Sequence, residues 1–119
     1  MLFRSGGAIW AAGNVTAYSD IKLKDNIETI DNALEKVLNA RGVYYTLKRD
    51  ETKTRKVGVV AQEMQEVLPE VVILHKDKED EEGTLAVDYG NITALLIEAI
   101  KEQQKQIEEL KAEVKALKG

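Results

Sequence analysis

The C-terminal end of the sequence, where a helical pattern runs without a break, constrains the fold more than any other feature. No proline or glycine occurs between residues 91 and 118, and Asn91 is a favourable N-cap at the start. At 1.5 Å per residue, a helix over residues 91–117 is about 40 Å long. The sequence therefore predicts one long C-terminal helix.

Apolar residues recur along this helix at heptad spacing. The alternating d and a positions hold, in order, Leu96, Ile100, Gln103, Ile107, Leu110, Val114 and Leu117. Over residues 103–117 this narrow stripe favours a coiled coil. Over residues 91–100 the apolar stripe is wider, and there a helix packed against its own domain is an equally good interpretation.

The charged residues beside this stripe favour parallel chains. Glu113 takes a g position and Lys118 the following e position, and these positions face each other between parallel helices. The number of chains stays open at this point. Ile or Val at a with Leu at d favours two strands, but the seam is only about three heptads long, so the globular part can override that preference.

The rest of the chain leaves few residues for a core, which also favours an oligomer. Residues 1–18 combine three glycines with small and isolated apolar residues. We expect short strands and turns there, with turns at Gly6-Gly7 and Gly13-Asn14. About 75–80 residues then remain for a compact domain, a size at which a core alone is marginal.

Composition excludes several classes of function. The chain has no cysteine and a single histidine, His75, so it has no disulfide, thiol nucleophile, cysteine zinc site or two-histidine site. A net charge of −4 disfavours a sequence-independent nucleic-acid surface. No apolar run approaches the roughly 18–20 residues of a membrane span. We therefore expect no nucleic-acid or membrane partner, no metal and no cofactor.

Periodicity predicts an α+β domain between the lead-in and the long helix, with two β-hairpins and short helices. The predicted elements are an extended piece with a turn at Asp25-Asn26 (19–28), a helix (29–41), a hairpin (43–49 with 56–60), a helix (61–68) and a second hairpin (71–75 with 84–89). In the first helix Thr29 or Asp31 is the expected cap and Gly42 the expected stop. The residues expected to face inward are Ile30, Leu34, Val37 and Leu38 in the first helix, and Ala61, Met64, Val67 and Leu68 in the second.

One pair of residues suggests chemistry. Ser19 precedes Lys24 by five positions, and a neutral lysine can take the proton of a serine hydroxyl that acts as a nucleophile. The positive charge of Lys22 would help to keep the Lys24 amine neutral. Burial by the apolar side chains of Ile21, Leu23 and Ile27 would act in the same direction. A serine and a lysine at this spacing are common, however, so a surface pair without chemistry fits these residues as well.

Three motifs resemble one known family. Residues 13–27, GNVTAYSDIKLKDNI, are similar to the start of the self-cleaving C-terminal intramolecular chaperone domain of bacteriophage tail spikes, tail fibres and neck appendages. Residues 58–63 with 67–72 resemble its second motif, and residues 87–89 with 95–101 its closing block. This is the endosialidase-type chaperone peptidase family. Lys22 stands where the family often has arginine, which keeps the charge and loses the bidentate fork.

The resemblance implies both an assembly role and a reaction. The helix would form a parallel trimeric coiled coil, so that the domain trimerises and assists the folding of an upstream spike or fibre protein. The chain would then cut itself between Tyr18 and Ser19, with Ser19 as nucleophile and Lys24 as general base. Asp20 and Asn26 would support the dyad. Such a chain is a single-turnover serine endopeptidase, which acts in the host cell cytoplasm during virion assembly.

The same resemblance divides the chain into three parts. Residues 1–18 would be the end of the upstream protein, residues 19–90 the chaperone and autoprotease core, and residues 91–119 the trimerisation helix. The client is the upstream domain of the same chain, and the chaperone part is released. The rival hypothesis is a structural trimerisation or attachment domain without catalysis.

Overall fold

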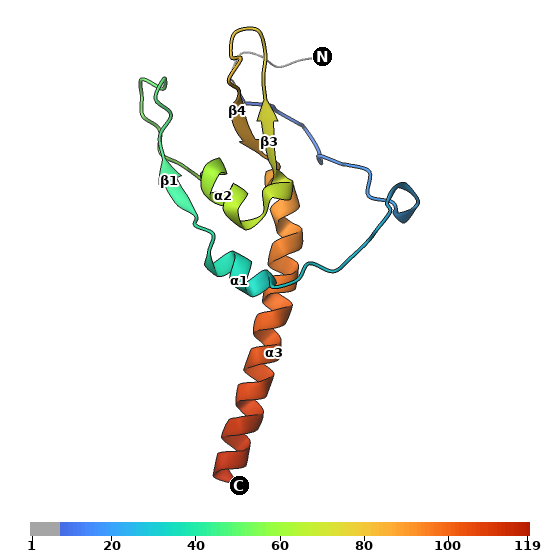
Figure 1. Ribbon diagram of the computed structural model, residues 1–119. Coiled ribbons are helices and arrows are strands. Elements are labelled where there is room, and N and C mark those ends of the chain that lie inside the picture. The colour runs from blue at the N-terminus through green and yellow to red at the C-terminus, as the bar shows by residue number, and fades with distance from the viewer. Residues whose placement is uncertain (1–7) are drawn as a thin grey trace.

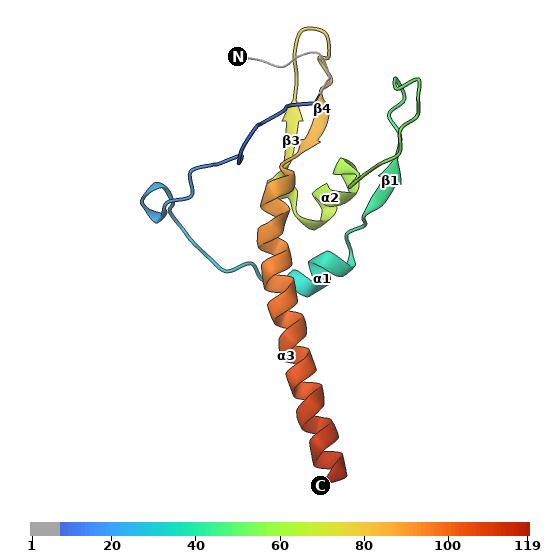
Figure 2. The same ribbon diagram turned by 180° about the vertical axis from the view of Figure 1, so that it is seen from behind.

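The structure, a computed structural model that describes residues 8–119, confirms the α+β fold class (Figure 1). Two small antiparallel hairpins and two short helices lie around the first turns of one long helix, and the reverse view shows the same arrangement (Figure 2). In chain order the elements are η1 (Ile21–Leu23), α1 (Ala33–Leu38), β1 (Val43–Tyr45), β2 (Lys56–Gly58), α2 (Ala61–Val67), η2 (Pro69–Val71), β3 (Val72–His75), β4 (Thr84–Val87), η3 (Tyr89–Asn91) and α3 (Ile92–Lys118).

Both predicted hairpins are present, although their strands are shorter than predicted. Tyr44 pairs with Val57 in the first hairpin, and Ile73 pairs with Ala86 in the second. Asp50 organises the loop between the strands of the first hairpin. Its carboxylate accepts hydrogen bonds from the backbone N–H groups of Thr52 and Thr54, each 3.1 Å long.

The first helix begins later and ends earlier than predicted. Neither Thr29 nor Asp31 caps it, because the N-cap residue is Asn32, in a left-handed conformation with φ of 48°. The Asp31 carboxylate instead lies 3.1 Å from the Lys36 ammonium, whose hydrogen bond holds the pKa of Asp31 below its usual value.

The helix stops at Leu38, before the expected Gly42, with Asn39 as its C-cap. The prediction that Leu38 faces inward is also wrong, since this side chain is 75% exposed. The other expected inward residues, Ile30, Leu34 and Val37, do pack partly buried against the core.

The N-terminal arm differs most from the prediction. Residues 8–18 contain no strand, and the expected extended piece at the start of 19–28 is a single 3-10 turn, η1. The turn forms because the Asp20 carboxylate accepts a 2.9 Å hydrogen bond from the backbone N–H of Lys22. Asn26 then takes a left-handed conformation, with φ of 55°, in agreement with the predicted turn there. The turn predicted at Gly6-Gly7 lies outside the described residues.

The core is small and centres on the beginning of α3. Its buried residues come from α1, α2, η2 and α3, and they are Ala33, Met64, Leu68, Val71, Leu95 and Ala99. Two further contacts tie the short helices to their neighbours. Arg41 forms a two-bonded ion pair with Glu63 at the start of α2. The backbone N–H of Leu34 donates a 3.0 Å hydrogen bond to the Glu102 carboxylate on α3, which replaces the missing local cap of α1.

The long helix α3 therefore has one face that packs against its own domain and one that is exposed. Ile92, Leu95, Ala99 and Glu102 face the domain of the same chain. The apolar residues of the heptad seam stay exposed, by 41–87%: Leu96, Ile100, Ile107, Leu110, Val114 and Leu117. Asn91 precedes α3 as predicted, but its side chain makes no capping hydrogen bond because η3 leads directly into the helix. None of the helices in residues 8–119 is long and apolar enough to cross a membrane.

The Glu102 contact predicts a measurable loss of stability. In Glu102→Ala the N–H of Leu34 loses its acceptor, and the free energy of unfolding is expected to fall by about 1 kcal/mol. Urea denaturation at fixed protein concentration measures this change. Glu109→Ala is the matched control, because Glu109 takes the same heptad position one repeat later and forms no hydrogen bond or ion pair in the described chain. Equal losses in both variants would contradict the capping role.

Candidate functional site

Ser19 and Lys24, the predicted nucleophile and base, lie side by side at η1. The Lys24 ammonium donates a 2.7 Å hydrogen bond to the Ser19 hydroxyl. The turn creates this contact, because the N–H groups of Leu23 and Lys24 donate to the carbonyl oxygens of Asp20 and Ile21. The five-residue spacing thus corresponds to one tight turn that returns the lysine to the serine. The geometry needs no contact with the rest of the domain.

The two residues expected to support the dyad act through the backbone. The Asp20 side chain caps the turn at Lys22 and has no hydrogen bond to Ser19 or Lys24. Asn26 contributes its left-handed backbone, which bends the chain away just after Lys24, and its side chain forms no hydrogen bond in the described part of the chain. Both residues therefore hold the shape of the segment that carries the dyad.

The segment with the dyad is exposed. Figure 1 shows η1 in blue, on an arm that stands away from α1 and α3. Tyr18 is 96% exposed, and Ile21, Leu23 and Ile27 are 62–74% exposed. These apolar side chains were expected to remove the lysine from water, and within one chain they do not. Residues 8–119 of one chain therefore leave Ser19 and Lys24 exposed.

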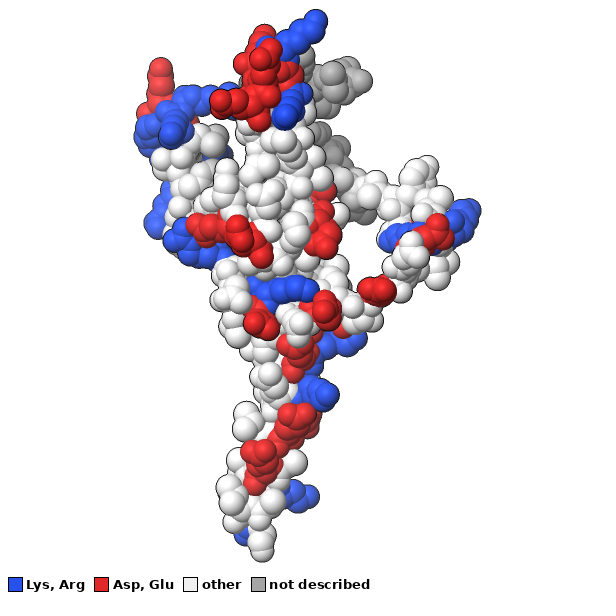
Figure 3. Space-filling view, viewed as in Figure 1, with Lys and Arg blue, Asp and Glu red and all other residues white. Residues whose placement is uncertain are grey.

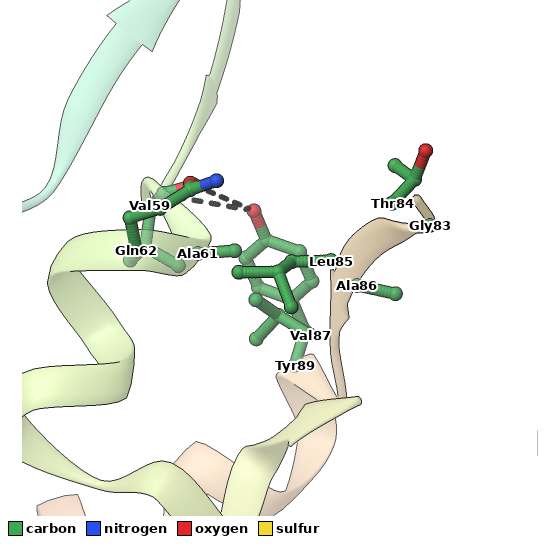
Figure 4. Close-up of a pocket in the computed structure, with 9 residues that line it drawn as sticks. All are labelled: Val59, Ala61, Gln62, Gly83, Thr84, Leu85, Ala86, Val87 and Tyr89. Carbon is green, nitrogen blue, oxygen red and sulfur yellow. Dashed lines mark hydrogen bonds between the residues drawn. The ribbon is translucent and has the colours of Figure 1, made fainter. Parts of the chain in front are cut away.

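A second structured place joins two of the sequence motifs. Tyr89, from the motif at 87–89, reaches the motif that begins at Gly58 (Figure 4). Its hydroxyl accepts a 3.1 Å hydrogen bond from the N–H of Val59 and lies 3.5 Å from the carbonyl oxygen of the same residue. A Cβ atom at position 58 would lie 2.5 Å from the Tyr89 hydroxyl oxygen, so only glycine permits this approach. Sequence reasoning placed both residues in motifs but did not find the contact between them.

The same contact borders an open pocket of about 680 Å³ between β4 and the start of α2. Tyr89, Leu85 and Val87 line one part of it, and Val59, Ala61 and Gln62 line another (Figure 4). No Asp, Glu, Lys, Arg or His side chain lines it. Within residues 8–119, no group of three or more His, Cys, Asp or Glu side chains is placed to hold a metal ion. The pocket therefore has neither a charged side chain nor a metal site in the described residues, and the candidate chemistry remains at Ser19 and Lys24.

Comparison with protein families identifies the segment that begins at the dyad. Residues 19–73 match a family model described as chaperone of endosialidase. Residues 19–73 belong to the chaperone of endosialidase family. The family also carries a peptidase designation. The chaperone segment starts at Ser19 and includes Lys24, β1, β2 and α2, whereas Tyr18 lies just before it and Tyr89 beyond its end.

Several relatives of this chain are long tail fiber proteins. The chain is 39% identical over 108 residues to long tail fiber protein Gp37 of Enterobacteria phage K3, and equally to that of Enterobacteria phage T2. It is 34% identical over 119 residues to long tail fiber protein Gp37 of Enterobacteria phage M1. The matches cover 87%, 87% and 92% of this chain. They span only 8%, 8% and 47% of the relatives' own lengths.

The close approach of Tyr89 to Gly58 predicts that Gly58→Ala destabilises the chaperone domain. The added methyl group would displace the Tyr89 hydroxyl from Val59, and the expected loss is about 1–3 kcal/mol, as for other overpacked sites. Thermal unfolding measures it.

Gly90→Ala is the control for the change in backbone entropy, since a Cβ atom there has no neighbour within 4 Å. If the two variants melt together, close packing at Gly58 is not important for stability.

Proposed function

We propose that this chain is an intramolecular chaperone that trimerises, assists the folding of an upstream tail fibre or spike protein, and then releases itself by cutting between Tyr18 and Ser19. The observation that carries the proposal is the 2.7 Å hydrogen bond between Lys24 and Ser19 at the first residue of the chaperone segment. In this proposal residues 1–18 are the end of the client, residues 19–90 the core and residues 91–119 the trimerisation helix.

The proposed reaction breaks one peptide bond and consumes one water molecule. The Ser19 oxygen attacks the carbonyl carbon of Tyr18 while a neutral Lys24 amine takes the hydroxyl proton. The bond from this carbon to the Ser19 nitrogen then breaks, and Lys24 returns the proton to the leaving amine. Water hydrolyses the resulting ester, which leaves a carboxylate on Tyr18 and restores the hydroxyl on Ser19. Asp20 is a positioning residue here, because it caps the turn that joins the dyad.

The exposure of the dyad couples this reaction to assembly. A lysine serves as a base only in its neutral form, which removal from water favours. In the single chain Ser19 and Lys24 are exposed, so the neighbouring chains have to supply the burial. Cleavage would then begin only after the chains have come together, and an unassembled chain would keep its chaperone.

The exposed seam of α3 supports the association of parallel chains in this proposal. Six apolar residues of one stripe have no partner in the described chain, and a parallel coiled coil would cover them. Joining three chains at one end raises their local concentration for the client. This helps because intertwined β-structure folds slowly and misassembles easily. Removal of the chaperone afterwards makes assembly hard to reverse, so the product is kinetically stable.

The dyad makes a direct prediction. The purified chain is expected to yield a fragment that begins at Ser19, and Ser19→Ala and Lys24→Ala are expected to reduce its formation by at least about a thousandfold. Intact mass spectrometry detects the fragment. Ser5→Ala and Lys105→Ala are matched controls that should leave the cleavage intact. Cleavage at this bond in both dyad variants would exclude the proposed mechanism.

The exposure of the arm also favours one other function, a structural trimerisation domain without catalysis. It shares the seam and the small core and differs only in the dyad. A trimer of the unmodified chain that stays uncut would support it over the proposed reaction.

The seam makes a separate prediction about assembly. Leu110→Asp puts a charge at a d position that is 59% exposed in one chain and buried in a coiled coil. Light scattering is expected to show loss of the trimer, and the Ser19 fragment is expected to disappear with it. Glu109→Lys changes a charge at the neighbouring position outside the seam. This variant should keep both the trimer and the Ser19 fragment. A variant at Leu110 that still assembles would show that the trimer does not use this seam.

A further inference from the structure

The two hairpins carry opposite charges of equal size. Residues 43–58, with β1 and β2, contain five lysines and arginines and two carboxylates. Residues 72–87, with β3 and β4, contain two lysines and five carboxylates. The net formal charges are therefore +3 and −3. Figure 3 shows these charges on two separate protrusions of the molecule, with the acidic residues gathered at the tip of the second hairpin.

In the described part of one chain, no ion pair joins the two hairpins. Arg55 lies over the ring of Tyr44 in its own hairpin, with 3.6 Å between the guanidinium and the ring centre. The side chains of Lys48, Arg49, Glu81 and Glu82 form no hydrogen bond or ion pair in the described part of the chain. Two basic and two acidic side chains are thus left for another molecule.

Each hairpin also has an exposed apolar pair on one face. The register places Tyr44 opposite Val57 in the first hairpin, and both side chains are exposed. Ile73 lies opposite Ala86 in the second, and these are exposed as well. An interface that combines apolar contact with complementary charge at its edge is typical of specific protein association.

The position of the two tips suits a ring of identical chains. Figure 1 shows both hairpins extending past the N-terminal end of α3, on different sides of the molecule. Rotation about an axis parallel to α3 leaves height along that axis unchanged. A copy rotated about such an axis therefore presents its acidic hairpin at the same end of the assembly as its neighbour's basic hairpin. This is the head-to-tail contact of a closed cyclic assembly.

We propose that the basic hairpin (residues 43–58) of one chain docks against the acidic hairpin (residues 72–87) of the next, so that the hairpins fix the order and rotation of the chains in the oligomer. This inference rests on the proposed parallel trimer and adds a second interface to its coiled coil. The coiled coil holds the C-terminal ends together, and the hairpin contacts close the ring at the opposite end, near the client.

Charge exchange tests the contact. Lys48→Glu with Arg49→Glu reverses two charges on the basic hairpin, and Glu81→Lys with Glu82→Lys reverses two on the acidic one. Each double variant is expected to raise the concentration at which the trimer half-dissociates by about tenfold or more, and the combined fourfold variant is expected to restore it. Analytical ultracentrifugation at low salt measures this concentration. Raising the salt should weaken the unmodified trimer and narrow the differences.

The control makes the same change in net charge as the variant at Lys48 and Arg49, but on the acidic hairpin. Lys76→Glu with Lys78→Glu makes the acidic hairpin more acidic, and association should stay the same or strengthen. If this control weakens the trimer as much as the change at Lys48 and Arg49, the effect is one of net charge and the proposed contact is wrong. The contact is equally wrong if the fourfold variant fails to recover.

Crosslinking tests which hairpins meet, because the chain has no cysteine of its own. A chain with Arg49→Cys and Glu81→Cys, treated with a short bismaleimide, is expected to give covalent dimers and trimers. Either single cysteine variant is expected to give no crosslinked product. Dimers from a single cysteine would show that like hairpins meet, which overturns the proposal.

These experiments separate this inference from the proposed function. A chain that sediments as a monomer at all concentrations contradicts the trimer itself. A trimer whose stability is the same in all the hairpin charge variants contradicts only the hairpin contact. Circular dichroism of each variant checks that the fold is retained, which is expected because the substituted side chains are exposed.

Discussion

The fold depends on how α3 divides its surface between its own domain and the solvent. Leu95 and Ala99 are the only fully buried residues that the long helix contributes within the described chain, and α1, α2 and η2 collect around them. Because a 3.6-residue helix turns 100° per residue, Leu96 and Ile100 cannot share that face and begin the exposed seam. One helix therefore supplies both residues of the core and an exposed apolar stripe, which is the surface for the proposed association. The apolar area buried in the core limits the area left for that association.

Sequence reasoning predicted elements whose causes are local and missed those whose causes are distant. The two hairpins, the end of α2 just before Pro69 and the long helix all follow from periodicity and breakers close in sequence. The start of α1 does not, since its cap is Glu102, far along the chain, and no local pattern points there. Tyr89 and Gly58 present the same difficulty, because the need for glycine arises from a ring that lies beyond two strands and a helix.

The geometry of the candidate site was predictable because its causes are local. Ser19 and Lys24 lie five residues apart, and one turn capped by Asp20 brings them together without help from the body. Such a spacing alone has little weight, and the surrounding motif made it specific. The expected shelter from Ile21, Leu23 and Ile27 was not found, because side chains on a free arm have nothing to pack against within one chain. Short-range geometry was therefore predictable, whereas burial was not.

The place of Ser19 in the turn also determines the stoichiometry of the proposed reaction. The nucleophile belongs to the bond that it breaks, so each chain provides one substrate and can act on it once. In that reaction Ser19 and Lys24 would leave together on the released piece, and the client would keep neither. The number of fragments that begin with serine would then equal the number of chains that completed assembly, so the amount of this fragment in a lysate would be a direct count of finished subunits.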